Sequence, residues 1–262
     1  MSQPNVPLIE YRVWDRTTRL FHWINVLCVF GLLAVGTMIL YAGDLGVPND
    51  GKIALKTLHV SIGYVFVINL FWRLVWGFIG GPYARWSKIL PGGEGYGRSF
   101  ASYVRRFVSG EPEPQVGHNP VGRIAVTIIL IALLVQGATG LILAGTDVYM
   151  PPFGQYFTEW VAGPDMDASQ VKPYAPETVN KQSYDEMRTF RGPIIKTHVT
   201  NYYLLLILIF LHIAAVIVSE MREGGGIISA MFTGRKLLPK ESDTPDDGRN
   251  DTTDPSETDP AA

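Results

Sequence analysis

The sequence predicts an all-α integral membrane protein, a bundle of four transmembrane helices with both termini in the cytoplasm. Charged residues make up only 18% of its 262 residues, against roughly 25% in soluble globular proteins. Four long windows contain almost none of these charges, and most basic residues lie on one side of them. Continuous apolar runs also exclude a β-barrel, whose strands need residues that alternate between lipid and lumen.

Each window is long enough to cross a bilayer as a helix, because a hydrocarbon core about 30 Å thick needs roughly 20 helical residues. The charged residues within them are Lys56 and Arg73, near opposite ends of the second window. No small-residue cleavage site follows the first window, so we expect it to be retained. The four windows are residues 20–42, 53–80, 124–145 and 199–219.

The basic residues predict the orientation. Fourteen Lys and Arg residues lie before the first window, between the second and third, and after the fourth, against seven on the other side when Lys56 at the end of the second window is counted there. The positive-inside rule therefore places both termini in the cytoplasm. The chain then divides into a cytoplasmic N-terminal segment 1–19, a membrane domain 20–222 and a cytoplasmic tail 223–262. From about residue 241 the tail is acidic and lacks large apolar residues, so we expect disorder there.

The connection 146–196, between the third and fourth windows, forms a long outer loop in this topology. Loops of that length are usually functional or disordered. Its aromatic content argues against disorder. Two interpretations stay open: a lid that packs on its own helix ends, or a platform on which a partner docks. Its aromatic residues include Tyr149, Tyr156, Trp160, Tyr174 and Tyr184.

The single cysteine, Cys28, lies in the first window and is expected to be a small buried apolar side chain. One cysteine excludes an intrachain disulfide, an iron–sulfur cluster held by four thiolates and the C-x-x-C-H attachment of a c-type haem. Any redox cofactor must therefore be held without thiolates.

Four of the five histidines, His22, His59, His198 and His212, lie inside or at the mouth of the apolar windows. Ionisable residues at such depths are costly and indicate a functional site. His198 and His212 share one face of the fourth helix, about 40° apart in azimuth and about 21 Å apart in depth. The helix directions then pair His22 with His212 at the inner level and His59 with His198 at the outer level.

Two stacked pairs of histidines suit two six-coordinate b haems, each with one imidazole on either side of the iron. Zinc fits less well, because a two-histidine zinc site wants further Asp, Glu or Cys ligands and the windows contain no acidic residue. A proton relay or metal transporter would also be expected to carry intramembrane carboxylates. A non-redox metal-binding membrane protein remains an alternative, which a visible spectrum would distinguish.

Other residues have a possible haem or quinone role beside an ordinary structural one. His118 has no partner at its depth, so we expect it to cap a helix entry or approach a haem propionate, not to ligate iron.

Small residues could let a macrocycle approach the backbone or could pack helices: Gly31, Gly36, Gly63, Gly137 and Gly140. Inner basic residues could neutralise propionates or set topology: Arg73, Arg85, Arg105 and Arg123. Polar residues within the windows could face quinone or bond between helices: Asn25, Asn69, Gln136 and Thr139.

Several motifs resemble those of the prokaryotic di-haem cytochrome b family, which includes bacterial cytochrome b561 and the cytochrome b subunits of Ni,Fe-hydrogenases. The residues are 13–23 (VWDRTTRLFHW), 58–64 (LHVSIGY) and 117–122 (GHNPVG), followed by His198 and His212. The resemblance covers about residues 13–222. The stretch 151–193 departs from the outer segment of the hydrogenase subunits.

The resemblance implies a multi-pass protein of the bacterial inner membrane with two non-covalent b haems, whose axial ligands map onto the same four histidines. It also implies electron transfer between an extracytoplasmic redox partner and the quinone pool. We therefore expect a hydrogenase, a c-type cytochrome or another oxidoreductase as partner, and no nucleic acid. The alternative is a self-contained superoxide:quinone oxidoreductase, which needs an open positive funnel at the outer haem and no docking platform.

Overall fold

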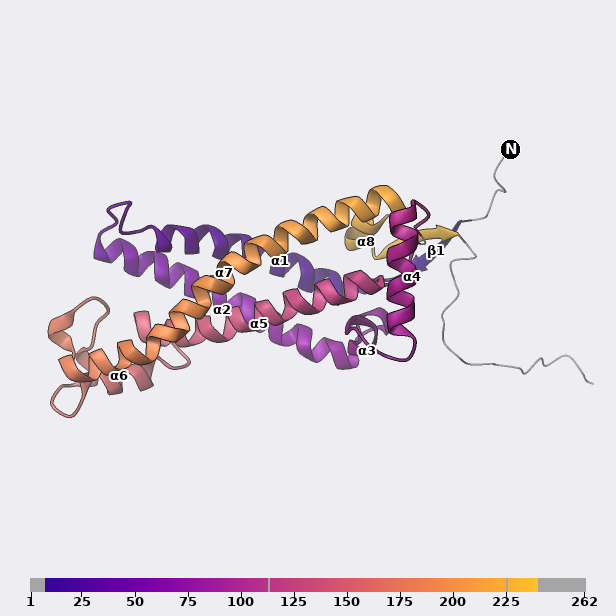
Figure 1. Ribbon diagram of the computed structural model, residues 1–262. Coiled ribbons are helices and arrows are strands. Elements are labelled where there is room, and N and C mark those ends of the chain that lie inside the picture. Colours follow the sequence, from indigo (N-terminus) through magenta and orange to yellow (C-terminus); the bar gives the residue numbers. More distant parts are fainter. Residues whose placement is uncertain (1–7, 113, 225, 240–262) are drawn as a thin grey trace, which may run out of the picture.

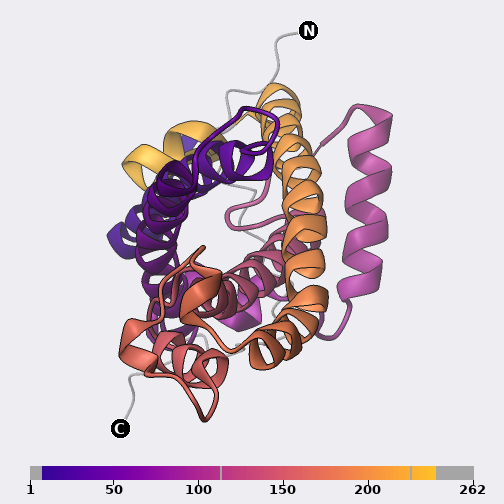
Figure 2. The same cartoon turned by 90° about the vertical axis from the view of Figure 1, so that its left-hand side faces the viewer.

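The computed structural model describes residues 8–112, 114–224 and 226–239, and four long helices dominate it (Figure 1). Within these ranges, four helices are long and apolar enough to cross a membrane, which confirms the four predicted spans. Seen along the bundle, they surround a common axis (Figure 2). They are α1 (Arg16–Leu40), α2 (Asn49–Ile79), α5 (Pro120–Val148) and α7 (Lys181–Glu223).

The helices pack in the order α1, α2, α5, α7, and a 2.8 Å hydrogen bond between the hydroxyls of Thr37 and Tyr202 joins α1 to α7. Cys28 is buried in the core, as expected. Large apolar side chains such as Leu27 and Phe71 are exposed on the outside of the bundle, where lipid would surround them. The central core consists of Cys28, Phe66, Leu70, Ala132, Leu133 and Leu205.

Side-chain caps start α1 and α5. Asp15 accepts a hydrogen bond from the Thr18 backbone N–H at 2.7 Å before α1, and Asn119 accepts from Gly122 N–H at 2.6 Å before α5. Such caps satisfy donors that the first helical turn leaves without partners. Asp15 also accepts from the indole N–H of Trp76 at 3.1 Å, so it ties the start of α1 to the end of α2.

The expected outer loop 146–196 is largely folded. It contains α6 (Gly154–Ala162), η2 (Ala168–Gln170), η3 (Pro176–Thr178) and the first turns of α7. The last helix begins at Lys181, far ahead of the apolar window 199–219, because the Asn180 side chain caps it. Apolar windows locate the part of a helix that lies in lipid, and the helix itself can continue into water.

Part of this outer segment packs on the neighbouring helix ends. Phe157 and Val161 of α6 bury themselves against Met187 of α7, and the backbone N–H of Asn180 donates to the Val161 carbonyl at 2.8 Å. α6 therefore packs on its own helix ends, as the lid interpretation expects. Other side chains on the same helix, such as Tyr156, remain exposed.

Short elements gather at the opposite end of the bundle: β1 (Leu8–Arg12), η1 (Pro82–Ala84), α3 (Trp86–Ile89), α4 (Tyr96–Ser109), α8 (Ile227–Thr233) and β2 (Arg235–Pro239). β1 pairs with β2 in antiparallel register, with Leu8 opposite Pro239. The all-α prediction missed both strands, because each has five residues and they come from distant parts of the chain. Residues 1–7 and the expected disordered tail from about 241 lie outside the described residues.

We expect Asp15→Ala to lower the thermal unfolding temperature of the protein in detergent, because loss of an N-cap costs about 1 kcal/mol and the Trp76 bond is lost as well. Asp44→Ala, in an exposed loop, is the matched control and should change little. Equal effects of the two substitutions would contradict the role of Asp15.

The same cap should make stability depend on pH. Partial burial opposes ionisation of Asp15, but hydrogen bonds from Thr18, Trp76 and Gly81 outweigh it and lower the pKa below the ordinary 3.8. This stabilisation is present above the ordinary pKa and is lost as the pH falls through the lowered one. The extra destabilisation at acidic pH should be absent in Asp15→Ala.

Candidate functional site

His59 on α2 and His198 on α7 face each other near the end of the bundle that carries α6. Their ring centroids are 6.4 Å apart. Imidazole nitrogens bind a metal at about 2.0–2.1 Å. Two metal–nitrogen bonds, together with the distance from each nitrogen to the centre of its ring, add up to about the observed separation of the centroids. The spacing therefore fits one iron between the two rings.

The protein holds His198 through both ring nitrogens. Nδ1 lies 2.9 Å from the Thr139 hydroxyl, and Nε2 lies 3.0 Å from the amide nitrogen of Gln136. Both partners come from α5, which has no histidine within its span. The sequence analysis offered these two residues as quinone contacts or cross-helix partners, and the structure shows the second arrangement.

Glycines bring the helix backbones close to the same two rings. A Cβ on Gly36 of α1 would lie 3.2 Å from the His59 ring, and a Cβ on Gly140 of α5 would lie 3.4 Å from the His198 ring. A Cβ on Gly63 would meet no atom of the described chain within 4 Å, which leaves open space beside α2. Gly31 and Gly137 instead face apolar side chains of α2, as ordinary packing residues do.

The inner pair comprises His22 on α1 and His212 on α7, which lie close enough to interact electrostatically. Among the described residues, the buried Nδ1 atoms of His22 and His59 have no hydrogen-bond partner. Buried polar atoms are normally satisfied, so these rings are not explained as simple helix-packing groups. The structure thus brings together the two pairs that the depth argument predicted.

His118 lies in a basic environment at the inner end, close enough to His212 to interact with it electrostatically. Its ring packs against Trp14 at 4.7 Å between centroids. Burial, and then the charges of Lys236, Arg73 and Arg123, lower the pKa of His118 to about 4. The ring is therefore neutral at physiological pH and adds no charge of its own to the surrounding cations.

Two of the four inner arginines, Arg73 and Arg123, each keep one buried nitrogen that has no partner among the described residues, although Arg123 also donates to backbone carbonyls such as that of Ser87. Arg73 is 6% exposed and donates to the Ala84 carbonyl at 3.2 Å. Within the described chain, Arg73 Nη1 and Arg123 Nε are buried without partners. Such donors fit the carboxylates of haem propionates. By contrast, Arg85 binds the Gly80 carbonyl and Arg105 is exposed on α4.

Lys236 is a basic residue that the sequence analysis counted only for topology. It is 6% exposed and donates to the backbone carbonyls of Gln115 at 3.0 Å and Gly117 at 3.4 Å. The β1–β2 pairing carries it into this position, so no local sequence signal marked it.

A charged cluster that the sequence analysis also missed ties three helices beside the outer pair. Asp147 at the end of α5 accepts from Lys56 of α2 and from Arg191 of α7. The Lys56 ammonium also lies 5.2 Å from the centre of the Tyr174 ring, which comes from the outer segment. Lys56 stands one turn before His59, so this cluster lies near the outer pair.

The remaining polar residues of the windows lie near the inner pair. Asn69 donates to the Phe21 carbonyl at 3.0 Å and so joins α2 to α1. Asn25 Oδ1 is buried and has no hydrogen-bond partner in the described part of the chain. Of the four polar residues, Asn25 therefore keeps an acceptor available for a ligand.

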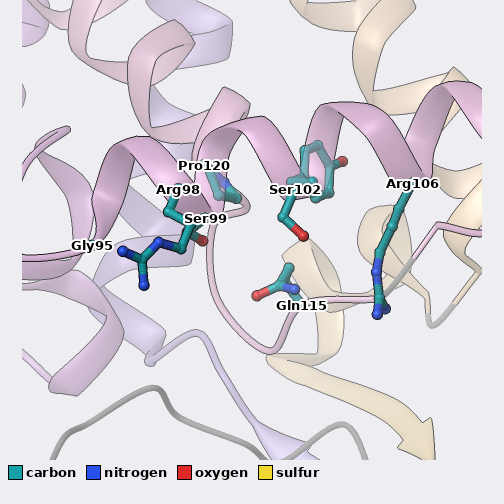
Figure 3. A pocket seen from close by; sticks show the side chains of 8 residues that line it. Gly95, Arg98, Ser99, Ser102, Arg106, Gln115 and Pro120 are labelled. Carbon is teal, nitrogen blue, oxygen red and sulfur yellow. The ribbon is translucent and has the colours of Figure 1, made fainter.

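A separate pocket of about 250 Å³ opens beside α4 at the inner end (Figure 3). It is lined by Arg98, Ser99, Ser102, Arg106 and Gln115, among others, and by none of the histidines. These residues point away from the bundle core, so the pocket is not part of the histidine site.

The donor set favours haem over a bare metal ion. In the described ranges, no group of three or more His, Cys, Asp or Glu residues could hold a metal ion. A haem brings its own equatorial nitrogens and needs only axial ligands from the protein. Two imidazoles per level are therefore a sufficient set.

Comparisons with known proteins identify the family of the chain. The family model described as prokaryotic cytochrome b561 matches residues 13–234. No solved structure gives a significant match.

Three relatives illustrate the similarity. The chain is 25% identical to a probable Ni/Fe-hydrogenase 1 B-type cytochrome subunit of Escherichia coli K12, over 64% of this chain and 76% of the relative. It is 23% identical to a probable Ni/Fe-hydrogenase B-type cytochrome subunit of Rhizobium leguminosarum, over 88% and 90%. The like-named protein of Rhodobacter capsulatus is 22% identical over 86% and 81%.

The family match spans the four membrane helices and the short elements at the inner end. With four apolar spans, it describes a multi-pass bacterial membrane protein with b-type haem as its cofactor. This chain belongs to the prokaryotic cytochrome b561 family.

Proposed function

We propose that the protein binds two b haems and passes electrons between an extracytoplasmic redox partner and the membrane quinone pool. The observation that supports this is the arrangement of histidines in two pairs at two depths, His22 with His212 and His59 with His198. Bound haem supplies reversible one-electron transfer. The protein's residues hold and orient the two groups and keep water away from them.

The inner and outer levels differ in charge, which assigns different tasks to their surroundings. At the inner level, Arg73 and Arg123 have unused donors beside the neutral His118, and we propose that they hold propionates. At the outer level, the carboxylate of Asp147 already pairs with both Lys56 and Arg191. Asn25, with its unpaired oxygen near the inner pair, is our candidate quinone contact.

A hydrogenase-type complex is the partner that the relatives suggest, since those proteins are named as B-type cytochrome subunits of Ni/Fe-hydrogenases. With cytoplasmic termini, α6 and its surroundings face the outside. Tyr156 is 61% exposed there on a helix that is anchored by the buried Phe157 and Val161. An exposed aromatic residue on a fixed support suits docking.

The superoxide:quinone alternative receives less support from the outer level. Lys56 and Arg191, the two cations of the cluster beside the outer pair, both contact Asp147. Tyr174 also lies close to Lys56. Cations that are paired with a carboxylate and partly covered attract a small anion less strongly than an open positive funnel would.

Purified protein should contain about two non-covalent b haems per chain, because each imidazole pair completes one iron. Acidic organic solvent should extract both, and a pyridine haemochrome assay gives the count. One haem at full loading, or haem that remains attached after extraction, would contradict the proposal.

Alanine substitutions should separate the haems by level. His22→Ala and His212→Ala should remove the same haem, and His59→Ala and His198→Ala the other, because the members of each pair lie on different helices but share a depth. Redox-resolved difference spectra identify the lost band. Loss of the same band from His22→Ala and His59→Ala would overturn the pairing.

The docking role predicts that Tyr156→Arg leaves both haems bound but reduces the amount of hydrogenase that co-purifies in mild detergent. A control is Leu27→Ala, which alters an exposed side chain on the lipid-facing surface and should change neither quantity. If Tyr156→Arg retains the partner, α6 is a structural lid. Co-purification of a c-type cytochrome or another oxidoreductase would replace hydrogenase as the partner.

A further inference from the structure

A continuous chain of hydrogen bonds joins α5 to α7 at the level of His198. The amide nitrogen of Asn201 donates to the Ala132 carbonyl at 2.9 Å and to Gln136 Oε1 at 2.7 Å. The Gln136 amide nitrogen lies 3.0 Å from His198 Nε2, and His198 Nδ1 lies 2.9 Å from the Thr139 hydroxyl. Asn201 is 7% exposed, so water does not compete at this end of the chain.

Backbone carbonyls at the two ends determine the direction of every bond, because a carbonyl oxygen can only accept. The Ala132 carbonyl can only accept, so the Asn201 side chain must turn its nitrogen toward it. The same nitrogen donates to Gln136 Oε1. The Gln136 side chain therefore turns its own nitrogen toward the His198 ring. At the other end, the Thr139 hydroxyl donates its one hydrogen to the Val135 carbonyl at 2.7 Å. Toward the ring, this hydroxyl therefore accepts.

Both ends lead to the same tautomer of His198. Gln136 donates to Nε2, which must carry the lone pair, and Thr139 accepts from Nδ1, which must carry the hydrogen. A ring in this form can bind iron through Nε2 while its Nδ1–H stays anchored. His59, the opposite ligand of the pair, has a buried Nδ1 without a partner in the described part of the chain.

We propose that Thr139 is a positioning residue for His198: its hydroxyl selects the tautomer that can ligate iron and makes this imidazole the more basic of the two outer ligands. The proposal rests on the haem proposed between His59 and His198. An acceptor at Nδ1–H raises the basicity of an imidazole ligand and thereby favours ferric over ferrous iron. Thr139 therefore lowers the reduction potential of the outer haem.

Gln136 has a complementary role before haem binds. Its amide covers the Nε2 lone pair of His198, and its orientation is held by Asn201. An iron at Nε2 takes the place of that contact. In the haem-free protein, Gln136 thus gives the buried His198 ring a hydrogen-bond partner and favours the tautomer with the hydrogen on Nδ1. It would no longer contact Nε2 once iron is bound there.

The test is Thr139→Val, which keeps the side-chain shape and removes the acceptor. Redox titration of the outer haem should show a potential above that of the wild type. Haem affinity at this level should fall, by roughly 10–100-fold if Thr139 behaves as other groups that orient metal ligands do. Thr139→Ser should restore the wild-type potential, because it restores the hydroxyl.

Thr127→Val is the matched control, because Thr127 lies on the same helix and makes the same type of bond to a backbone carbonyl, that of Arg123 at 2.8 Å, away from His198. It should leave the outer potential unchanged. An unchanged potential in Thr139→Val, or an equal shift in Thr127→Val, would overturn the role of Thr139.

NMR of the ring nitrogens in haem-free protein provides a second readout and should show His198 protonated at Nδ1. Protonation at Nε2 would also overturn the inference. If the wild type has no haem at this level, the proposed function fails, and the NMR result still decides the tautomer.

Discussion

Hydrocarbon offers no hydrogen-bond partner, so each polar side chain within the membrane part has to find one inside the bundle. The rotation of the helices about their axes follows from this requirement. Asn201 binds the Ala132 carbonyl and joins α7 to α5, while Asn69 binds the Phe21 carbonyl and joins α2 to α1. These bonds turn the histidine faces of α1, α2 and α7 inward, where His198 in turn meets Thr139 on α5.

The two histidine levels differ in how their cationic side chains are paired. At the outer level both cations are paired with a carboxylate, because Asp147 binds Lys56 and Arg191. The inner level carries buried cationic donors without partners among the described residues, at Arg73 and Arg123. A buried charge is tolerated when an opposite charge accompanies it, so the inner level is suited to a ligand with carboxylates. This difference would give the two proposed haems different surroundings.

The outer segment and the inner elements frame the membrane part in different ways. α6 is anchored through Phe157 and Val161 against α7, which fixes the position of its exposed Tyr156. At the inner end, the antiparallel pairing of β1 with β2 closes the two ends of the described chain over the bundle. Extramembrane parts of a multi-pass protein lie in water and can vary in sequence without disturbing the membrane core.

The sequence by itself determined the four spans and the two pairs of histidines, because lipid imposes a minimum apolar length and the helical rise converts sequence separation into depth. Residues such as His22 and His212 could therefore be matched without a structure. Only the tertiary structure decided that Thr139 and Gln136 hold His198. It also decided that Asp147 pairs with both Lys56 and Arg191 and that Lys236 is buried near His118. Depth follows from position along a helix, whereas contacts between helices depend on their rotation and on pairings between distant segments, which no local pattern encodes.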